Sequence, residues 1–312
     1  DGRDVTIPVL IQHVERAGVH SGDSISLLPA LDLTERQKDA IVDYTLRIAR
    51  ALPHRGLLNI QFIVREDDVY CLEVNPRASR TVPIVSKVMG IPMVGWATRV
   101  QLGESLRSFA PTGLMNSPDV FAAKGPVFST SKLPGVDPAL GPSMKSTGEV
   151  LGLGESPEEA VAKVLPYVIG SPLFRLGPGV SVGLSVADKA KPDLERIVPD
   201  LLRLGVSLWA TPGTARWITD RWGAVVEELE PERWTARLQG EGAKMVLNIP
   251  GSGGDARRKG FHLRQACLNW QVPCFTSMDT FRWVIRIQEA DRGQASPPLP
   301  LQAINRKERM MR

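Results

Sequence analysis

The sequence of 312 residues carries 38 Lys and Arg against 34 Asp and Glu, a formal charge of +4, and is 43% hydrophobic and 23% charged. This length predicts about two globular domains, and the balance of residue types excludes a chain that is disordered throughout. No apolar run approaches the roughly 20 residues that cross a bilayer, and no signal peptide opens the chain, so we expect no membrane association. Three cysteines without a CxxC or zinc-like spacing fit a reducing compartment, and we expect a cytoplasmic protein.

Most of the positive charge lies at the C-terminal end of the chain. Residues 291–312 contain five basic and two acidic side chains, which gives +3 of the total of +4. Because the remainder is almost neutral and shows no basic stripe, we expect no nucleic-acid partner. The prolines of this tail predict a disordered extension.

The first half of the chain predicts a mixture of helices and strands. A capping box of Thr34 and Gln37 marks the start of a helix that runs to Leu52, and two strand-like runs, 57–65 and 69–75, are joined by an acidic turn. Further along we expect two short helices that begin near prolines, at 83–90 and 92–102. A mostly irregular stretch with short strands should follow at 107–155, and then a helix at 156–168 that a second capping box opens.

From about residue 178 the pattern changes to a regular alternation of short apolar strands and helical segments. Such alternation predicts a parallel sheet covered by helices, with ligands bound at the carboxyl ends of its strands. We therefore expect an α/β protein with an α+β domain at 1–177 and a parallel-sheet domain at 178–290. The expected strands are 180–186, 206–210, 224–227, 245–249 and 273–276, and the expected helices are 192–204, 214–221, 258–270 and 277–289.

The two strands of the predicted hairpin carry polar residues that could hold a metal ion. Side chains alternate along a strand, so Glu73 and Asn75 point the same way, and a suitable register would bring Gln61 to the same face. One carboxylate and two amide oxygens suit a hard cation such as Mg²⁺. Arg77 and Arg80 follow as guanidinium groups that could bind phosphate or carboxylate oxygens. The alternative is a solvated polar face that ends in a turn.

A glycine-rich segment at 18–24, with the sequence Gly-Val-His-Ser-Gly-Asp-Ser, is a second candidate. Two glycines around His20 and Ser21 would let backbone amides approach a phosphate or carboxylate closely. The alternative is an ordinary glycine-rich turn with a histidine that faces solvent.

The predicted parallel sheet gathers a third set of polar residues at one edge. Thr211 and Thr214 lie between a strand and the helix that follows it, where backbone amides favour an anion. Asn248 lies at the end of another strand, and Arg257 and Arg258 open the next predicted helix. Lys191 precedes the helix after the first strand of this domain and would fall at the same edge. Because no Asp–His pair or nucleophile elbow is present, we interpret this edge as a binding site and not a catalytic one.

Three long motifs carry a resemblance to a known family. They are Gly18-Val-His-Ser-Gly-Asp-Ser24, Glu73-Val-Asn-Pro-Arg-Ala-Ser-Arg-Thr-Val-Pro83 with Val85-Ser-Lys87, and Pro134-Gly-Val-Asp137 leading to Ser146-Thr-Gly-Glu-Val150. Together they resemble the C-terminal part of the large subunit in the carbamoyl-phosphate synthetase family. Biotin carboxylases would instead show E-M-N-T-R followed by Q-V-E-H. The pair His20-Ser21 favours the second of the family's two ATP-grasp repeats, which phosphorylates carbamate. The resemblance covers residues 1 to about 290 and weakens after 230.

This resemblance implies a fold and a set of cofactors. Residues 1–177 would be the C-terminal portion of the ATP-grasp unit with its trailing segment, and 178–290 a methylglyoxal-synthase-like regulatory domain. ATP would be the substrate, and Mg²⁺ or Mn²⁺ would be held by Gln61, Glu73 and Asn75, with Glu73 as the bridging ligand.

The resemblance also implies residue roles at the nucleotide. Gly18, Val19, His20 and Ser21 would line the nucleotide and its phosphates. His20 and Arg77 would serve the phosphoryl transfer, Arg77 by neutralising charge on the transferred group.

In the second domain the resemblance implies regulation. Lys191, Thr211, Thr214 and Asn248 match positions that hold a nucleotide monophosphate effector of the UMP or IMP type. Ornithine-sensitive members of the family carry a carboxylate where this chain has Gly125, while the other two amine-binding carboxylates of the resemblance, Glu15 and Asp23, are present. The departure at Gly125 argues against activation by ornithine.

The expected partners follow from the same resemblance. They are the preceding part of the large subunit and a glutamine amidotransferase small subunit, in arginine or pyrimidine biosynthesis. Because the chain begins with Asp1 and not Met, we expect a fragment that alone makes no carbamoyl phosphate. Two other hypotheses stay open, a non-catalytic nucleotide-binding regulatory module and a different ATP-grasp carboxylate ligase.

Overall fold

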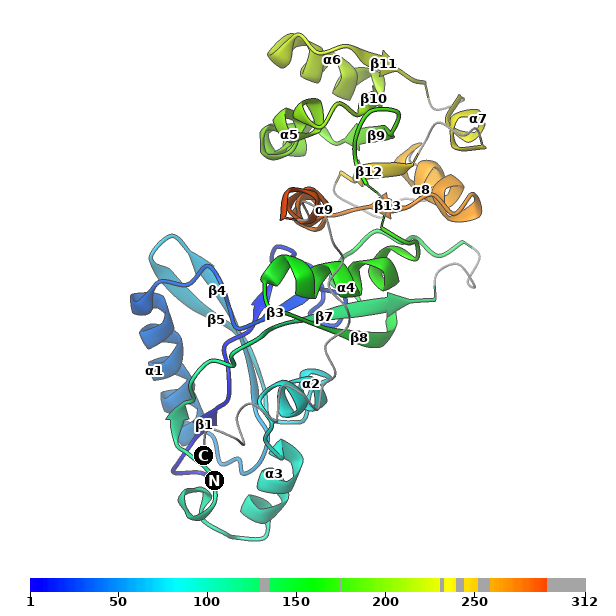
Figure 1. Ribbon diagram of the computed structural model, residues 1–312. Helices are drawn as coiled ribbons and strands as arrows, with labels where there is room; N and C mark the ends of the chain where they lie inside the picture. Colours follow the sequence, from blue (N-terminus) through cyan, green and yellow to red (C-terminus); the bar gives the residue numbers. More distant parts are fainter. Residues whose placement is uncertain (130–134, 174, 231–232, 240–243, 252–258, 291–312) are drawn as a thin grey trace.

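The computed structural model describes residues 1–129, 135–173, 175–230, 233–239, 244–251 and 259–290 (Figure 1). The α/β fold class is confirmed, with mixed and antiparallel elements in the first half and a parallel sheet in the second. The predicted disordered tail at 291–312, and Arg257 and Arg258, lie outside the described residues. None of the helices in the described part of the chain has the length and apolar character that a membrane crossing requires.

The predicted helix is α1 (Glu35–Ala51), and the predicted hairpin consists of β4 (Asn59–Arg65) and β5 (Asp68–Asn75). The helix packs against the hairpin. The capping box is formed, because the Thr34 hydroxyl accepts from the Gln37 amide at 3.3 Å and the Gln37 side chain accepts from the Thr34 amide at 2.9 Å. The Gln37 side chain also donates to the carbonyl of Glu66 at 2.7 Å and so ties the helix start to the hairpin turn.

A four-stranded antiparallel sheet forms the centre of the first half, in the order β2-β3-β7-β8. Its strands are β2 (Gln12–His13), β3 (Ser26–Leu28), β7 (Phe121–Phe128) and β8 (Ser146–Gly154). Most of the described residues of 107–155 lie outside strands, as predicted, but β7 and β8, with 8 and 9 residues, are longer than the short strands expected there. The glycines of these two strands serve packing: a Cβ at Gly152 would lie 2.3 Å from the carbonyl oxygen of Ala160, and one at Gly125 would lie 2.8 Å from Val164. Both contacts are with α4 (Pro157–Ile169), which covers this sheet closely.

The second predicted capping box is only half formed. The Ser156 hydroxyl accepts from the Glu159 amide at 3.1 Å, but the Glu159 carboxylate accepts from the amide of Glu155 and not from that of Ser156. The first half contains further elements outside this sheet. They are β1 (Thr6–Ile7) paired with β6 (Gly113–Leu114), α2 (Thr81–Val88), α3 (Met93–Gln101) and the short helix η1 (Leu106–Ser108).

The parallel sheet of the second half is confirmed, with strand order β11-β10-β9-β12-β13. β10 and β11 follow β9 on one side, whereas β12 and β13 lie on its other side, so the strand order reverses between β9 and β12. Open α/β sheets bind ligands at such a switch point. The strands are β9 (Ser181–Val186), β10 (Ser207–Ala210), β11 (Val226–Glu228), β12 (Met245–Ile249) and β13 (Cys274–Phe275).

The helices of this domain largely match the prediction. The expected helix at 192–204 is instead a 3-10 helix and an α-helix, because Ile197 adopts a non-helical conformation with φ −136° and Pro199 starts a new helix. Helix α7 was not predicted. The helices are η3 (Asp188–Arg196), α5 (Val198–Arg203), α6 (Pro212–Trp222), α7 (Trp234–Gln239), α8 (Lys259–Asn269) and α9 (Met278–Ala290).

The two halves are joined through α9, which lies against α4 between the two sheets (Figure 1). Arg286 of α9 forms an ion pair with Glu158 of α4. The Arg16 guanidinium contacts Asp193 at 2.9 Å and Asp279 at 3.2 Å, so one side chain of the first half bridges η3 and α9. The boundary near residue 177 stays a prediction.

Candidate functional site

The hairpin places the three predicted metal ligands together. In the β4–β5 register Gln61 pairs with Glu73 and Asn59 pairs with Asn75, so Gln61, Glu73 and Asn75 share one region of the hairpin. The Asn75 amide donates to the Glu73 carboxylate at 2.9 Å. A β-bulge after Gln61 shifts the register and leaves Leu72 more than half exposed, at 57%. No residue pattern in the hairpin indicates this bulge.

The chemistry of this set fits a hard divalent cation. One carboxylate and two amide groups offer oxygen ligands, the type that Mg²⁺ and Mn²⁺ prefer. Glu73 is exposed and can share an ion with an incoming phosphate group. The described residues hold no group of three or more His, Cys, Asp and Glu side chains placed around one ion, so the proposed protein ligands are a single carboxylate and two amides.

The turn after β5 presents two arginines differently. Arg77 is exposed and donates to the carbonyl of Ala78 at 2.9 Å, so its guanidinium stays accessible. Arg80 is also exposed, but its guanidinium donates to the Ser146 hydroxyl at 3.2 Å. Since the Ser146 hydroxyl donates to the Gly22 carbonyl at 3.1 Å, Arg80 connects the hairpin end to the glycine-rich segment.

The segment 18–24 is held in place by its own residues and by the chain at 141–146. The buried Asp23 carboxylate accepts hydrogen bonds from the backbone amides of Lys145 and Ser146. The shortest distance between nitrogen and oxygen is 2.8 Å for each amide. The His20 amide donates to the carbonyl of Gly141 at 2.8 Å. Gly18 has a positive φ of 106°, a conformation that favours glycine.

His20 has a defined hydrogen-bonding state. Its Nδ1 accepts from the Gly22 amide at 3.0 Å, so the proton of the neutral ring resides on Nε2. The imidazole can therefore donate from Nε2 to a ligand oxygen. Gly18 is exposed and Val19 and Ser21 are half-buried, so part of this segment stays open to solvent.

A buried lysine supports the same segment and was not among the predicted site residues. Lys124 is 1% exposed and donates to the carbonyl of Ser21 at 3.1 Å. Burial lowers the pKa of Lys124, and the carboxylates of Glu149, Glu15 and Asp23 oppose that effect. Its position on β7 could have been predicted only by placing 107–155 in a sheet.

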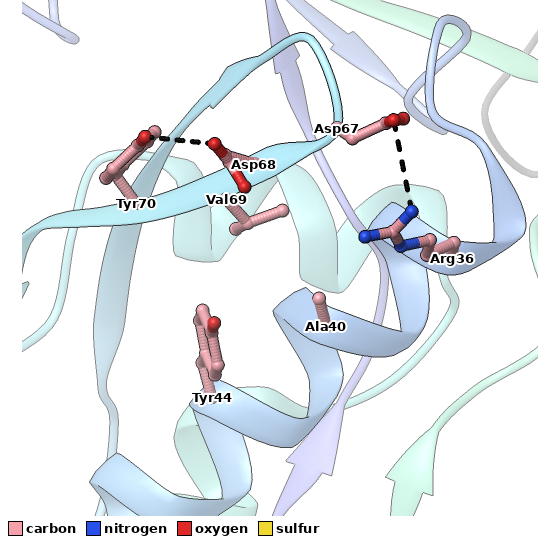
Figure 2. Close-up of a pocket in the computed structure, with 7 residues that line it drawn as sticks. All are labelled: Arg36, Ala40, Tyr44, Asp67, Asp68, Val69 and Tyr70. Atoms are coloured by element: carbon pink, nitrogen blue, oxygen red, sulfur yellow. Dashed lines mark hydrogen bonds and ion pairs between the residues drawn. The ribbon is translucent and has the colours of Figure 1, made fainter.

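A cavity of about 460 Å³ lies at the other end of the hairpin (Figure 2). It is formed between α1 and the start of β5, and none of the predicted site residues lines it. Asp67 forms an ion pair with Arg36 at 3.9 Å, and the Tyr70 hydroxyl donates to Asp68 at 3.2 Å (Figure 2). We place the candidate chemistry at the Glu73 end, because that end gathers oxygen ligands, arginines and the glycine-rich segment.

The edge of the parallel sheet brings the four predicted effector residues to the carboxyl ends of adjacent strands. Thr211 caps α6, and the Lys191 ammonium lies against the first turn of that helix, because a Cβ at Gly213 would be 3.2 Å from Lys191 Nζ. The amide of Thr211 donates to the carbonyl of Leu184 of β9 at 3.1 Å. An anion at this edge would meet a helix N-terminus and a lysine charge.

All four of these residues already have partners within the protein. The hydroxyl of the buried Thr214 accepts from the Val186 amide at 3.1 Å and donates to the Val186 carbonyl at 3.3 Å. The side-chain nitrogen of Asn248 donates to the carbonyl of Ser185 at 3.2 Å, and its side-chain oxygen accepts from Arg264 at 2.5 Å. The Lys191 ammonium pairs with the exposed Asp188 carboxylate at 2.7 Å, and the Thr211 hydroxyl donates to the Thr214 hydroxyl at 3.1 Å. Thr214 is buried, and its bonds to Val186 fix the end of β9.

The chain matches two family models. Residues 2–109 match the ATP binding domain of the carbamoyl-phosphate synthase L chain, and residues 193–276 match the MGS-like domain. The chain is 39% identical over 295 residues to the carbamoyl phosphate synthase large chain of Clostridium perfringens (strain 13 / Type A), covering 93% of this chain and 27% of that protein. It is 44% identical over 294 residues to the large chain of Thermomicrobium roseum, covering 92% of this chain and 27% of that protein.

Solved structures give weaker similarities. A biotin carboxylase domain of a single-chain bacterial carboxylase aligns with a TM-score of 0.43 and 19% identity, covering 53% of this chain and 44% of that one. Methylglyoxal synthase from Elizabethkingia anophelis aligns with a TM-score of 0.30 and 16% identity, covering 35% of this chain and 79% of that one. The chain spans about a quarter of the length of the curated relatives it matches, 27%.

Proposed function

We propose that this chain, a relative of carbamoyl phosphate synthase large chains over 93% of its length, supplies part of an ATP site that phosphorylates carbamate. In this step a carbamate oxygen attacks the γ-phosphorus of ATP, the bond to the β-phosphate oxygen breaks, and carbamoyl phosphate and ADP form. Positioning and charge neutralisation provide most of the catalysis of such a transfer.

The pairing of Gln61 with Glu73, with Asn75 hydrogen-bonded to Glu73, is the observation that carries this proposal. These residues would hold Mg²⁺ or Mn²⁺, which supplies charge neutralisation at the nucleotide phosphates when bound. Arg77 would bind oxygens of the transferred phosphoryl group through its accessible guanidinium.

The glycine-rich segment would contact the nucleotide. His20 would donate from Nε2 to a phosphate oxygen, since its Nδ1 is occupied by the Gly22 amide. Gly18, Val19 and Ser21 would line the phosphates, with Lys124 and Asp23 holding the backbone of the segment in position.

The parallel-sheet domain would bind a nucleoside monophosphate effector of the UMP or IMP type. Lys191 and Thr211, at the N-terminus of α6, would contact its phosphate. We also propose that the chain acts with the rest of a large subunit and a glutamine amidotransferase small subunit, in the cytoplasm, for arginine or pyrimidine synthesis.

The reverse of the proposed step, formation of ATP from ADP and carbamoyl phosphate, tests the hairpin in a full-length large chain that contains this segment. Glu73→Gln keeps the side-chain size and removes the charge, and we expect it to lower this rate about a hundredfold or more. Asp67→Asn, on the exposed turn of the same hairpin, is the matched control and should keep the rate. An unchanged rate in Glu73→Gln would refute the hairpin as the metal-binding element.

A further inference from the structure

The chain at 135–146 connects the parallel-sheet domain with the glycine-rich segment. On one side the Asp137 carboxylate accepts two hydrogen bonds from Arg264 of α8, from Nε and Nη2, both at 2.6 Å. The remaining nitrogen of the guanidinium, Nη1, donates to the Asn248 amide oxygen at 2.5 Å. Arg264 is 4% exposed, so this charge is buried between the two acceptors.

On its other side the same stretch reaches the glycine-rich segment. The Asp137 carbonyl accepts from the Lys145 ammonium at 2.8 Å, and the Lys145 amide donates to the Asp23 carboxylate at 2.8 Å. The His20 amide donates to the carbonyl of Gly141 at 2.8 Å. A continuous series of hydrogen bonds therefore runs from Asn248 through Arg264 and Asp137 to Asp23.

Because of the geometry of the Arg264 guanidinium, a change at either end of this series of hydrogen bonds should affect the whole series. A guanidinium is planar, and all three of its nitrogens donate to acceptors here. These hydrogen bonds fix both the position and the plane of the group. The Asn248 side chain is likewise engaged at both of its polar atoms. A ligand that replaces either of these partners of Asn248 therefore changes a contact with Ser185 or with Arg264.

We propose that Arg264 is a positioning residue that holds the stretch 135–146 against the glycine-rich segment and transmits ligand occupancy beside Asn248 to that segment. The transmission rests on the proposed effector site, whereas the positioning role does not. Coupling of this kind is reciprocal, so disturbing Arg264 alters both the segment at 18–24 and the affinity of the edge for its ligand.

Hydrogen–deuterium exchange of the full chain without ligand tests the positioning role. Asp137→Asn keeps the shape of the side chain but removes the charge and one acceptor of Arg264. We expect the amides of Lys145, Ser146 and the segment 18–24 to exchange about tenfold faster or more. Glu158→Gln is the matched control, because it weakens another contact between the halves, the pair with Arg286, outside this series. Unchanged exchange in Asp137→Asn, or equal acceleration in both variants, would overturn the positioning role.

Addition of uridine or inosine monophosphate tests the transmission, with calorimetry to follow binding. We expect either probe that binds to change exchange at 18–24 in the unsubstituted chain. In Arg264→Lys, which keeps the charge but loses the two-pronged contact, this change should disappear while binding persists with altered affinity. Persistence of the full change in Arg264→Lys overturns the transmission. Failure of both probes to bind the unsubstituted chain contradicts the effector site and the transmission together, while the ligand-free comparison still decides the positioning role.

Discussion

The Thr280 hydroxyl of α9 donates a hydrogen bond to the Glu15 carboxylate at 2.6 Å, across 265 positions of the chain. The other oxygen of Glu15 accepts from the Ile25 amide at 2.8 Å. Glu15 is thus a buried carboxyl group at the junction of the two halves. Burial raises the pKa of Glu15 to about 7, although these hydrogen bonds and the charge of Lys124 oppose the rise.

The buried Glu15 predicts a pH-dependent loss of stability. Between about pH 4.5 and 7 the native state keeps the proton that the unfolded state releases, so the free energy of unfolding falls as the pH rises, by up to about 3 kcal/mol. Glu15→Gln cannot titrate and should lose this decline. Urea denaturation of both proteins at several pH values measures this decline, and parallel profiles would contradict the raised pKa of Glu15.

His13 provides an opposing slope that the same experiment must separate. Burial, with the nearby charge of Lys124, lowers the pKa of His13 to about 4, so the unfolded state binds more protons between about pH 4 and 6.5. Stability from His13 therefore rises with pH over this window. In the Glu15→Gln variant the free energy of unfolding should therefore rise with pH over this window, because the opposing effect of Glu15 is gone. Adding His13→Gln should flatten its dependence on pH.

The local elements of this fold were predictable because their signals are local. Thr34 and Gln37 form the predicted capping box, and the alternation after residue 178 gives the predicted parallel sheet. These features depend on residues close in sequence or on a repeated pattern. The pairing of Gln61 with Glu73 does not, because the register set by the turn would place Gln61 opposite Leu72, and the bulge between Gln61 and Phe62 brings it opposite Glu73.

The features that were not predicted depend on contacts between distant residues. The glycines of β7 and β8 indicate loops in a sequence, but they are required because α4 packs against their backbone. Lys124 looks like a surface residue until its strand is placed in the centre of a sheet. Likewise, no pattern in the sequence links Asp137 to Arg264, which are 127 positions apart.

Gly152 should tolerate no larger residue. A Cβ there would lie 2.3 Å from the Ala160 carbonyl oxygen, and backbone atoms of a packed helix cannot move aside cheaply. We expect Gly152→Ala to reduce the free energy of unfolding by about 1–3 kcal/mol or more. On the same strand a Cβ at Gly148 would lie 3.6 Å from Val127, an ordinary contact, so Gly148→Ala is the matched control. Equal melting temperatures for the two variants would contradict the packing argument.

The effector edge should respond differently to Lys191 and Thr214. Lys191→Ala removes a charge beside the N-terminus of α6, and we expect uridine or inosine monophosphate to bind about tenfold more weakly or worse, with unchanged stability. Thr214→Val leaves the amide and carbonyl of Val186 without their hydroxyl partner, so its main effect should be a loss of about 1–3 kcal/mol in stability. Calorimetry and urea denaturation of both variants separate these effects. The reverse assignment, with affinity lost in Thr214→Val alone, would show that Thr214 contacts the ligand.

His20 offers a test that separates the structure of the glycine-rich segment from its contact with the nucleotide. An asparagine at position 20 can place its amide oxygen near the present position of Nδ1 and still accept from the Gly22 amide. It lacks the distal donor that Nε2 provides. In a full-length large chain we therefore expect His20→Asn to raise the KM for ADP in the reverse reaction about tenfold. Amide exchange at Gly22 should stay close to that of the unsubstituted protein. An unchanged KM with intact exchange would exclude His20 from the nucleotide site, whereas faster exchange at Gly22 would show that the ring nitrogen, and not its position alone, holds the segment.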